Sequence, residues 1–125
     1  MRLLLDTNVL LWVAAGDTRV AHLQNRILDS DNEVYVSAAS FWEVAIKVGV
    51  GKLDIDVATL RQEVRDSGYL ELPVLGVHTE QLALLPAIHK DPFDRMLVAQ
   101  ANAEPMRLLT GDQLLSQYGA NIEVI

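Results

Sequence analysis

In Arg2-Leu3-Leu4-Leu5-Asp6-Thr7-Asn8, a short apolar run ends abruptly at a carboxylate, and the fold class can be inferred outward from this segment. An apolar run of this length predicts a buried strand. The apolar segment at residues 9–15 follows almost at once and is closed by Gly16, which predicts a helix. A buried strand that leads directly into a helix is the opening unit of an α/β fold.

The same alternation continues outward from this unit. Further strands are predicted at residues 34–37, 69–74, 107–110 and 122–124, and further helices at 40–48, 58–67, 79–85, 92–103 and 112–117. Ser40 is the predicted cap of the helix at 40–48, and Pro73 marks residues 69–74 as an edge strand or an exit. Strands that alternate with helices imply a mainly parallel sheet covered on both faces.

Length and composition limit the possible classes of protein. The 125 residues, 50% of them hydrophobic, fit a single domain over residues 1–125. There is no Cys, which excludes disulfides, thiolate metal sites and a cysteine nucleophile and is compatible with a reducing cytoplasm. No apolar run approaches the roughly 18 residues needed to cross a bilayer, so we expect a cytoplasmic protein without a membrane partner.

The charge balance has the wrong sign for a protein that holds nucleic acid by bulk electrostatics. Ten Lys and Arg face 17 Asp and Glu, for a net charge of −7. An RNA substrate would therefore require a local reversal of sign. Divalent cations would contribute, together with basic residues gathered around one cleft, among them Lys47, Lys52, Lys90 and Arg95.

Two acids stand where open α/β sheets bind ligands, outside the carboxyl ends of the strands. Asp6 follows the first predicted strand, and Asp112 follows the fourth in Leu-Leu-Thr-Gly-Asp. Asp is also a good helix N-cap, so capping explains either residue alone equally well. The pair together favours a functional site.

Asp94 lies on the helix that opens at Asp91-Pro92, and it shares a face with apolar residues three, four and seven positions later. Its carboxylate should therefore point toward the core, where an unpaired charge costs several kcal/mol and calls for a cation or a hydrogen-bonded partner. Asp91 is better explained as the N-cap of this helix, with Pro at the first helical position.

Glu43 allows two interpretations. It precedes Lys47 by four residues, the spacing of a surface ion pair on a helix. Its neighbours Phe41, Trp42, Val44, Ala45 and Ile46 are nearly all apolar, however, which leaves little solvated face for such a pair. Glu43 could then turn inward toward a site.

Four carboxylates without Cys form an all-oxygen ligand set, which suits Mg²⁺ or Mn²⁺ better than zinc. The chemistry that needs this set is phosphoryl transfer, in which one metal activates a water and a second, about 4 Å away, can stabilise the leaving oxygen. The histidines at positions 22, 78 and 89 are scattered and share no ligand spacing, so we interpret each as a surface or structural residue.

The chain resembles PIN-domain proteins, specifically VapC-type toxins of bacterial toxin–antitoxin pairs. Four segments carry the resemblance and occur in family order: Leu-Leu-Asp-Thr-Asn-Val-Leu-Leu-Trp around Asp6, Ser-Phe-Trp-Glu-Val-Ala-Ile-Lys with a following Gly-Lys-Leu around Glu43, His-Lys-Asp-Pro-Phe-Asp-Arg-Met-Leu-Val-Ala-Gln-Ala around Asp94, and Leu-Leu-Thr-Gly-Asp ending in Asp112. They span nearly the whole chain, and together they form a much more specific signal than any one of them.

The resemblance implies a PIN-like, Rossmann-like sheet of five parallel strands in the order 3-2-1-4-5. It also implies Mg²⁺- or Mn²⁺-dependent cleavage of single-stranded RNA, a homodimer, and inhibition by a cognate antitoxin. We expect a basic residue of that antitoxin to reach the acids, and we expect it to dock on an exposed apolar face of this chain that includes Trp12 or the pair Phe41 and Trp42. The residues it implicates as metal ligands are Asp6 and Asp94, with Glu43 and Asp112 in support. Thr7 and Thr110 could orient water or ligands, and Arg95 or Lys47 could contact phosphate. Asp91 is an extra acid, which leaves open whether it or Asp94 coordinates the metal directly.

Three alternatives remain open. Leu-Leu-Leu-Asp-Thr also resembles the nucleophile strand of aspartyl-phosphate phosphatases, but that family expects a second Asp where Asn8 stands. A phospho-receiver module that binds Mg²⁺ expects an adjacent acidic pair after the first strand and a Lys after the last, and neither is visible. A PIN fold kept only as a scaffold would usually have lost the acids that are present.

Overall fold

A computed structural model describes all 125 residues and contains one sheet of five parallel strands. The strands are β1 (Arg2–Leu5), β2 (Glu33–Ser37), β3 (Leu70–Leu72), β4 (Arg107–Thr110) and β5 (Ile122–Val124). Their order is β3-β2-β1-β4-β5, and every neighbouring pair is parallel. The predicted α/β class and strand order are therefore confirmed.

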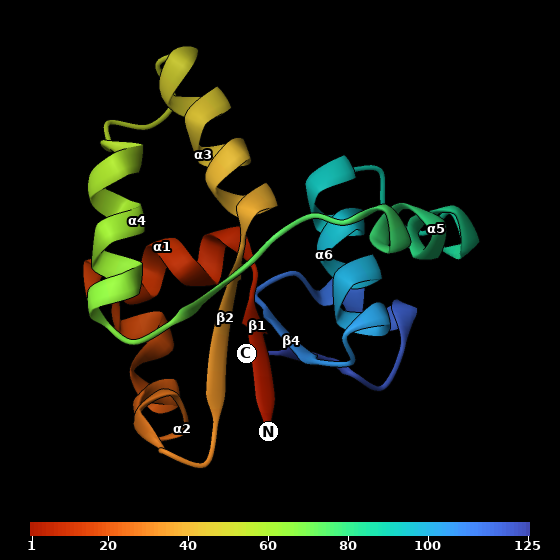
Figure 1. Ribbon diagram of the computed structural model, residues 1–125, viewed down its shortest axis with the longest axis horizontal. Helices are drawn as coiled ribbons and strands as arrows, with labels where there is room; N and C mark the ends of the chain where they lie inside the picture. The colour runs from red at the N-terminus through yellow and green to blue at the C-terminus, as the bar shows by residue number, and fades with distance from the viewer.

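Helices cover both faces of the sheet. The elements are α1 (Thr7–Ala15), η1 (Thr18–Leu23), α2 (Gln24–Leu28), α3 (Ala38–Gly49), α4 (Val57–Asp66), α5 (Gly76–Leu84), α6 (Pro92–Ala103) and η2 (Gln113–Tyr118), where η1 and η2 are 3₁₀ helices. Figure 1 shows α1 to α4 on one side of the strands and α5 and α6 on the other. None of these helices combines the length and the apolar character that a membrane crossing requires.

The central position of β1 in the sheet explains why its sequence is continuously apolar. Leu3 and Leu5 belong to the larger core, under α1, α3 and α4, whereas Leu4 belongs to the second core, under α6 and η2. All three are completely buried. Successive side chains of a strand point to opposite faces, and a parallel sheet covered on both faces needs apolar residues at every position.

The start of α3 differs from the prediction. Ser37, not Ser40, caps the helix: its hydroxyl accepts from the backbone N–H of Ala39 at 3.0 Å. The reason is that β2 ends at Ser37 and the helix begins at the next residue, without an intervening loop. Ser40 instead lies buried inside the helix, where its Oγ accepts a hydrogen bond from the Thr7 hydroxyl at 3.0 Å.

Three further boundaries differ for local reasons. No element was predicted between the first helix and the second strand, yet η1 and α2 form there, with η1 capped by the Asp17 side chain. The helix α5 begins at Gly76 rather than at residue 79, because the His78 ring accepts from the backbone N–H of Leu75 and stabilises an earlier turn. Strand β3 ends before Pro73, which has no N–H for the ladder.

Gly111, between β4 and Asp112, allows an unusually close approach of an aromatic ring. A Cβ atom at this position would lie 2.7 Å from Cη2 of Trp12, which is closer than carbon atoms can approach. The Trp12 ring packs against the larger core, and the Arg19 guanidinium lies over it, 4.6 Å from its centroid. The indole therefore has neighbours that resist its displacement.

We predict that Gly111→Ala destabilises the protein by about 1–3 kcal/mol, because the Trp12 ring must move out of a packed position. Urea denaturation of the metal-free protein measures the change. Gly49→Ala is the matched control, because a Cβ there meets nothing within 4 Å and Ala is the better helix former. Equal stability of the two variants would show that Trp12 swings aside without cost.

Candidate acidic metal centre

The strand order brings the ends of β1 and β4 together. These strands are neighbours, and the backbone N–H of Asp6 extends their pairing by donating to the Leu109 carbonyl at 3.0 Å. After β1 the chain runs into α1 on one face, whereas helix α6 before β4 and η2 after it pack on the other. This divergence is the topological switch point at which open α/β sheets bind ligands.

Asp6 is both a helix cap and a buried acid at this point. Its Oδ1 accepts from the backbone N–H of Val9 at 2.8 Å, and the residue is only 3% exposed. Burial raises the pKa of Asp6, although hydrogen bonds from the Thr110 hydroxyl and from the backbone of Val9 and Gly111 oppose the rise. The capping interpretation is thus confirmed, and it places the carboxylate at the switch point.

Asp94 enters the site from α6 on the other side. The pKa of Asp94 is raised to about 7, mainly by burial and in addition by the negative charges of Asp91, Asp6 and Glu43, while His89 opposes the rise. The interaction between charges falls off with distance. The carboxylates of Asp6, Glu43 and Asp91 therefore lie near enough to Asp94 to disfavour its charged form.

Asp91 holds the first turn of α6. Its Oδ1 accepts from the backbone N–H groups of Phe93, at 2.8 Å, and Asp94, at 3.0 Å. The predicted N-cap with Pro92 at the first helical position is confirmed. Asp91 thereby fixes the backbone from which the Asp94 side chain projects.

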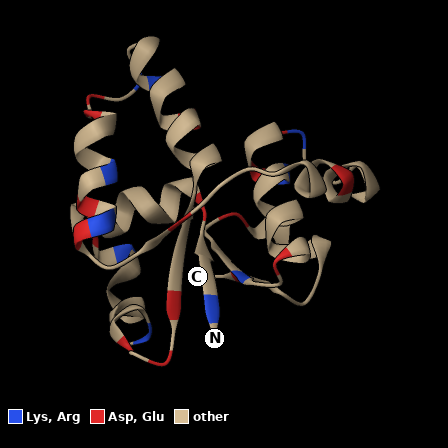
Figure 2. Cartoon of the chain, in the orientation of Figure 1, with Lys and Arg blue, Asp and Glu red and all other residues tan.

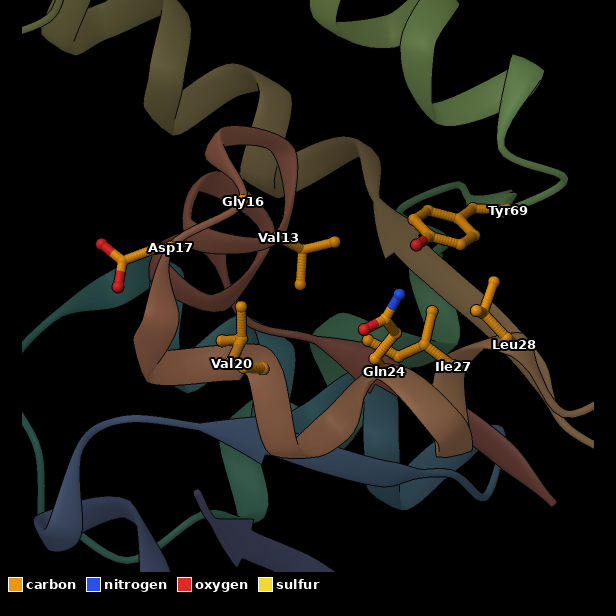
Figure 3. Close-up of a pocket in the computed structure, with 9 residues that line it drawn as sticks. Val13, Gly16, Asp17, Val20, Gln24, Ile27, Leu28 and Tyr69 are labelled. Carbon is orange, nitrogen blue, oxygen red and sulfur yellow. The ribbon is translucent and has the colours of Figure 1, made fainter.

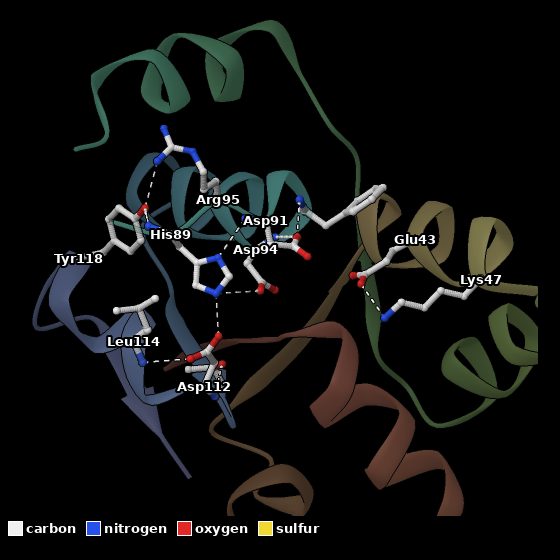
Figure 4. A network of polar contacts seen from close by, with 11 residues as sticks. Glu43, Lys47, His89, Asp91, Asp94, Arg95, Asp112, Leu114 and Tyr118 are labelled. Carbon is white, nitrogen blue, oxygen red and sulfur yellow. Dashed lines mark hydrogen bonds and ion pairs between the residues drawn. The ribbon is translucent and has the colours of Figure 1, made fainter. Parts of the chain in front are cut away.

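Glu43 satisfies both interpretations offered by its sequence. Its Oε2 pairs with Nζ of Lys47 at 2.9 Å, as the four-residue spacing predicts. The residue is nevertheless 7% exposed, and its Oε1 is buried without any hydrogen-bond partner. In Figure 4 the Glu43 carboxylate lies at the end of α3 that faces α6. A buried carboxylate oxygen normally accepts a hydrogen bond or binds a cation, and Oε1 of Glu43 does neither here.

His89 lies in the cluster, although its sequence position gave no sign of this; that it is a structural residue rather than a ligand stays a prediction. Its Nε2 lies 2.7 Å from Oδ2 of Asp112 and 3.7 Å from Oδ2 of Asp94. These three side chains could together reach one metal ion. His89 precedes Asp94 by five residues, just outside the helix, and linear spacing does not reveal that the α5–α6 connection folds back toward Asp112.

The other two histidines fit the prediction. His78 is fully buried, with Nδ1 accepting from Leu75 and Nε2 paired with Glu104 at 2.5 Å, and His22 is exposed. Neither lies among the acids. They are structural and surface residues, respectively.

The predicted auxiliary residues fall into two groups. Thr7 and Thr110 lie close to Asp6: Thr7 bonds to Ser40, and the Thr110 hydroxyl accepts from the backbone N–H of Asp112 at 3.0 Å. Arg95 is held elsewhere, since its Nη1 donates to Tyr118 and to the Pro86 carbonyl, each at 3.0 Å (Figure 4).

Basic residues do not gather at the acids. Figure 2 shows Lys and Arg dispersed over α4, the connection between α3 and α4, the connection before α6, and the ends of strands. Several are occupied by acids outside the site, including Arg26 and Arg107 with Glu123, and Arg61 with Glu71. Lys47 is the cation in direct contact with the cluster.

One surface pocket lies away from the acids. It has a volume of about 320 Å³ and is lined mainly by apolar residues of α1, η1 and α2, with Tyr69 across from them (Figure 3). None of the clustered carboxylates lines it. Its composition suits apolar side chains rather than a phosphate.

Aromatic residues expected on an exposed docking face differ in their surroundings. Trp42 is 63% exposed and stacks edge-on against Phe93 of α6 at a centroid distance of 4.9 Å. Phe41 is buried in the larger core, and Trp12 covers Gly111, so the expectation is wrong for Phe41.

Comparisons of the sequence and of the structure with known proteins point to the same fold. The model of the PIN domain family matches residues 3–121. Ribonuclease VapC22 of Mycobacterium tuberculosis is 26% identical, over 92% of this chain and 90% of its own length. VapBC2 from Rickettsia felis, solved bound to a DNA fragment from its promoter, superposes with a TM-score of 0.70 at 15% identity, covering 100% of this chain and 98% of that one. A toxin-antitoxin complex from Klebsiella pneumoniae gives 0.67 at 18% identity, covering 98% and 96%.

We predict that Asp94→Asn stabilises the metal-free protein at alkaline pH. Because the folded-state pKa of Asp94 is raised from 3.8 to about 7, the folded chain binds more protons than the unfolded chain between these values, and stability falls as pH rises through that window. Removing the charge should gain about 1–3 kcal/mol at pH 8, after allowance for solvent screening, and nothing below about pH 4.

Denaturant melts in EDTA at pH 4 and pH 8 measure this difference. Asp54→Asn, on the exposed connection between α3 and α4, is the control and should be neutral at both pH values. A loss of stability in Asp94→Asn at pH 8 would mean that the carboxylate makes a net favourable contribution to the fold.

Proposed function

This chain belongs to the PIN domain family, and on that premise we propose that it is a metal-dependent endoribonuclease that acts as the toxin of a toxin–antitoxin pair. The relative named as a ribonuclease and the complexes of similar fold support this assignment. The observation that carries it is the buried Glu43 Oε1, which has no partner and faces acids contributed by other elements.

A divalent cation fits the residues that are present. Asp6, Glu43 and Asp94 repel one another in a partly dehydrated space, and the hydrogen bonds of the chain leave this repulsion unbalanced. Carboxylate oxygens are the ligands of hard cations. We propose that Asp6 and Asp94 bind Mg²⁺ or Mn²⁺ directly and that Glu43 and Asp112 complete the site.

The residues around this site have distinct proposed roles. A bound divalent ion supplies Lewis acidity and lowers the pKa of water. The Asp6 carboxylate is aimed by its cap bond to Val9, and the Asp94 backbone is fixed by Asp91. Lys47, freed from Glu43 when that carboxylate turns to a cation, would meet a phosphate of the RNA. With a net charge of −7, the chain depends on this local reversal of sign.

We predict that EDTA abolishes cleavage of a labelled single-stranded RNA and that Mg²⁺ or Mn²⁺ restores it. Asp6→Asn and Asp94→Asn should each reduce the rate by at least about a hundred-fold while leaving the protein folded, because each removes a charge that positions the cation. Asp54→Asn should cleave like the parent. Cleavage that persists in excess chelator, by protein free of metal, would contradict the mechanism.

The same preparation separates the alternative functions. Turnover of a phosphomonoester through an aspartyl phosphate would select the phosphatase, and aspartyl phosphorylation without turnover would select the receiver module. Neither requires RNA. A protein that binds Mg²⁺ yet attacks none of these substrates would favour the scaffold interpretation.

An antitoxin is the proposed protein partner, as in the complexes that share this fold, and we propose a homodimer as the toxin assembly. Apolar side chains of the antitoxin would suit the pocket between α1 and α2 and the exposed Trp42. An Arg or Lys from its inhibitory segment would pair with the clustered carboxylates by charge-assisted hydrogen bonds.

We therefore predict that inhibition by the proposed antitoxin weakens as Mg²⁺ is raised, because its basic side chain and the cation compete for the same carboxylates. The two chains are co-expressed, and basic residues of the partner are replaced one at a time. Full inhibition by every variant, with no effect of Mg²⁺, would show that the partner acts without entering the acidic site.

A further inference from the structure

We propose that His89 is a positioning residue of the metal site: a neutral imidazole whose Nε2–H donates to Asp112 beside Asp94 and holds these carboxylates in place without coordinating the cation. The proposal rests on the proposed metal site. It goes beyond that site because the proposed ligand set of four acids includes no role for a histidine.

The hydrogen bonds of the ring define its tautomer. The backbone N–H of Asp91 donates to Nδ1 of His89 at 3.0 Å, so Nδ1 must offer its lone pair and carry no proton. The proton of the neutral ring is then on Nε2, which lies 2.7 Å from the Oδ2 of Asp112. Both ring nitrogens are thus engaged, one as acceptor and one as donor.

This tautomer opposes direct coordination of a metal by His89. Coordination through Nε2 would remove the proton from Nε2, and a neutral ring would then carry it on Nδ1, against the N–H of Asp91. That N–H belongs to the residue that caps α6, so the turn cannot give it up without disturbing the cap. The geometry favours Nε2–H as a hydrogen-bond donor within the site.

The backbone of His89 is held independently of its ring. Its N–H donates to the Tyr118 hydroxyl at 2.9 Å, and that hydroxyl also accepts from Arg95 of α6 at 3.0 Å. Figure 4 shows the imidazole held between the Asp94 and Asp112 side chains. The ring therefore projects into the cluster from a fixed point rather than from a free loop.

The contacts of Asp112 show why a hydrogen bond from Nε2–H of His89 would matter. This side chain is 41% exposed, and apart from His89 it is held only by the cap bond from Leu114 to its Oδ1. Repulsion from Asp94 would favour rotation of Asp112 toward solvent. The Nε2–H of His89 lies between these two carboxylates and offsets the repulsion. It thereby prepares Asp112 to face a cation shared with Asp94.

Imidazole ¹⁵N–¹H NMR of the unmodified protein tests the tautomer directly. We expect a proton on Nε2 and none on Nδ1 in EDTA, and the same pattern after saturation with Mg²⁺, which is diamagnetic. A proton on Nδ1 in EDTA would overturn the assigned tautomer and with it the proposal. Loss of the Nε2 proton when Mg²⁺ binds would also overturn the proposal, because it would make His89 a ligand.

Two variants of His89 separate its local and long-range bonds. The His89→Asn side chain can accept from the N–H two residues on, as Asx turns do, but it cannot reach Asp112. The longer side chain of His89→Gln can present an amide N–H near the position of Nε2. His22→Asn, an exposed histidine outside the cluster, is the matched control.

Calorimetric titration with Mg²⁺ is the readout, and thermal melts confirm folding. We expect His89→Asn to weaken Mg²⁺ binding by about ten- to a hundred-fold, and His89→Gln to restore most of it. Unchanged affinity in His89→Asn would overturn the positioning role while leaving the metal site intact. Absence of Mg²⁺ binding by the parent would overturn the metal site itself, whatever the tautomer.

Discussion

The parallel pairing of β1 with β4 organises both the core and the acidic site. It joins residues 2–5 to residues 107–110, about a hundred positions apart in the chain, and it lies in the middle of the sheet with apolar residues packed on both faces. Every acid of the site is placed with respect to this pair. Asp6 follows one strand, Asp112 follows the other, and α3 and α6 approach from opposite sides to add Glu43 and Asp94.

Gathering carboxylates in a partly buried space is unfavourable, and helix caps hold them there. Asp6, Asp91 and Asp112 each accept a backbone N–H at the start of a helical segment, which orients an oxygen and supplies a donor to an anion. Capping and a functional role are therefore complementary for these residues. Asp94 has no such bond, and it is the acid whose pKa is raised to about 7. The least satisfied carboxylates, Asp94 and Glu43, are those with most to gain from a cation.

Much of the fold was readable from local sequence, and the departures have specific causes. The apolar run at Leu3 to Leu5 and the Asp91-Pro92 pair set a strand and a helix start that the structure confirms. The predicted cap at Ser40 differs from the observed cap at Ser37 because the direct passage from β2 to α3 leaves no loop to mark the boundary. His89 was missed as a neighbour of the acids because its partner Asp112 lies 23 positions later, on a strand end that only the sheet brings close.

The alternation of strands and helices, the order of the motifs and the choice of four acids as a set could be inferred from sequence alone, because they follow from periodicity, caps and a family pattern carried by neighbouring residues. Tertiary structure alone decided how each acid is satisfied. It paired Glu43 with Lys47 yet left one oxygen buried and without a partner, held Arg95 against Tyr118, and placed a histidine between Asp94 and Asp112. The physical reason is that burial and hydrogen-bond geometry depend on groups far apart in the chain, and only the packed sheet and helices bring them within a few ångströms.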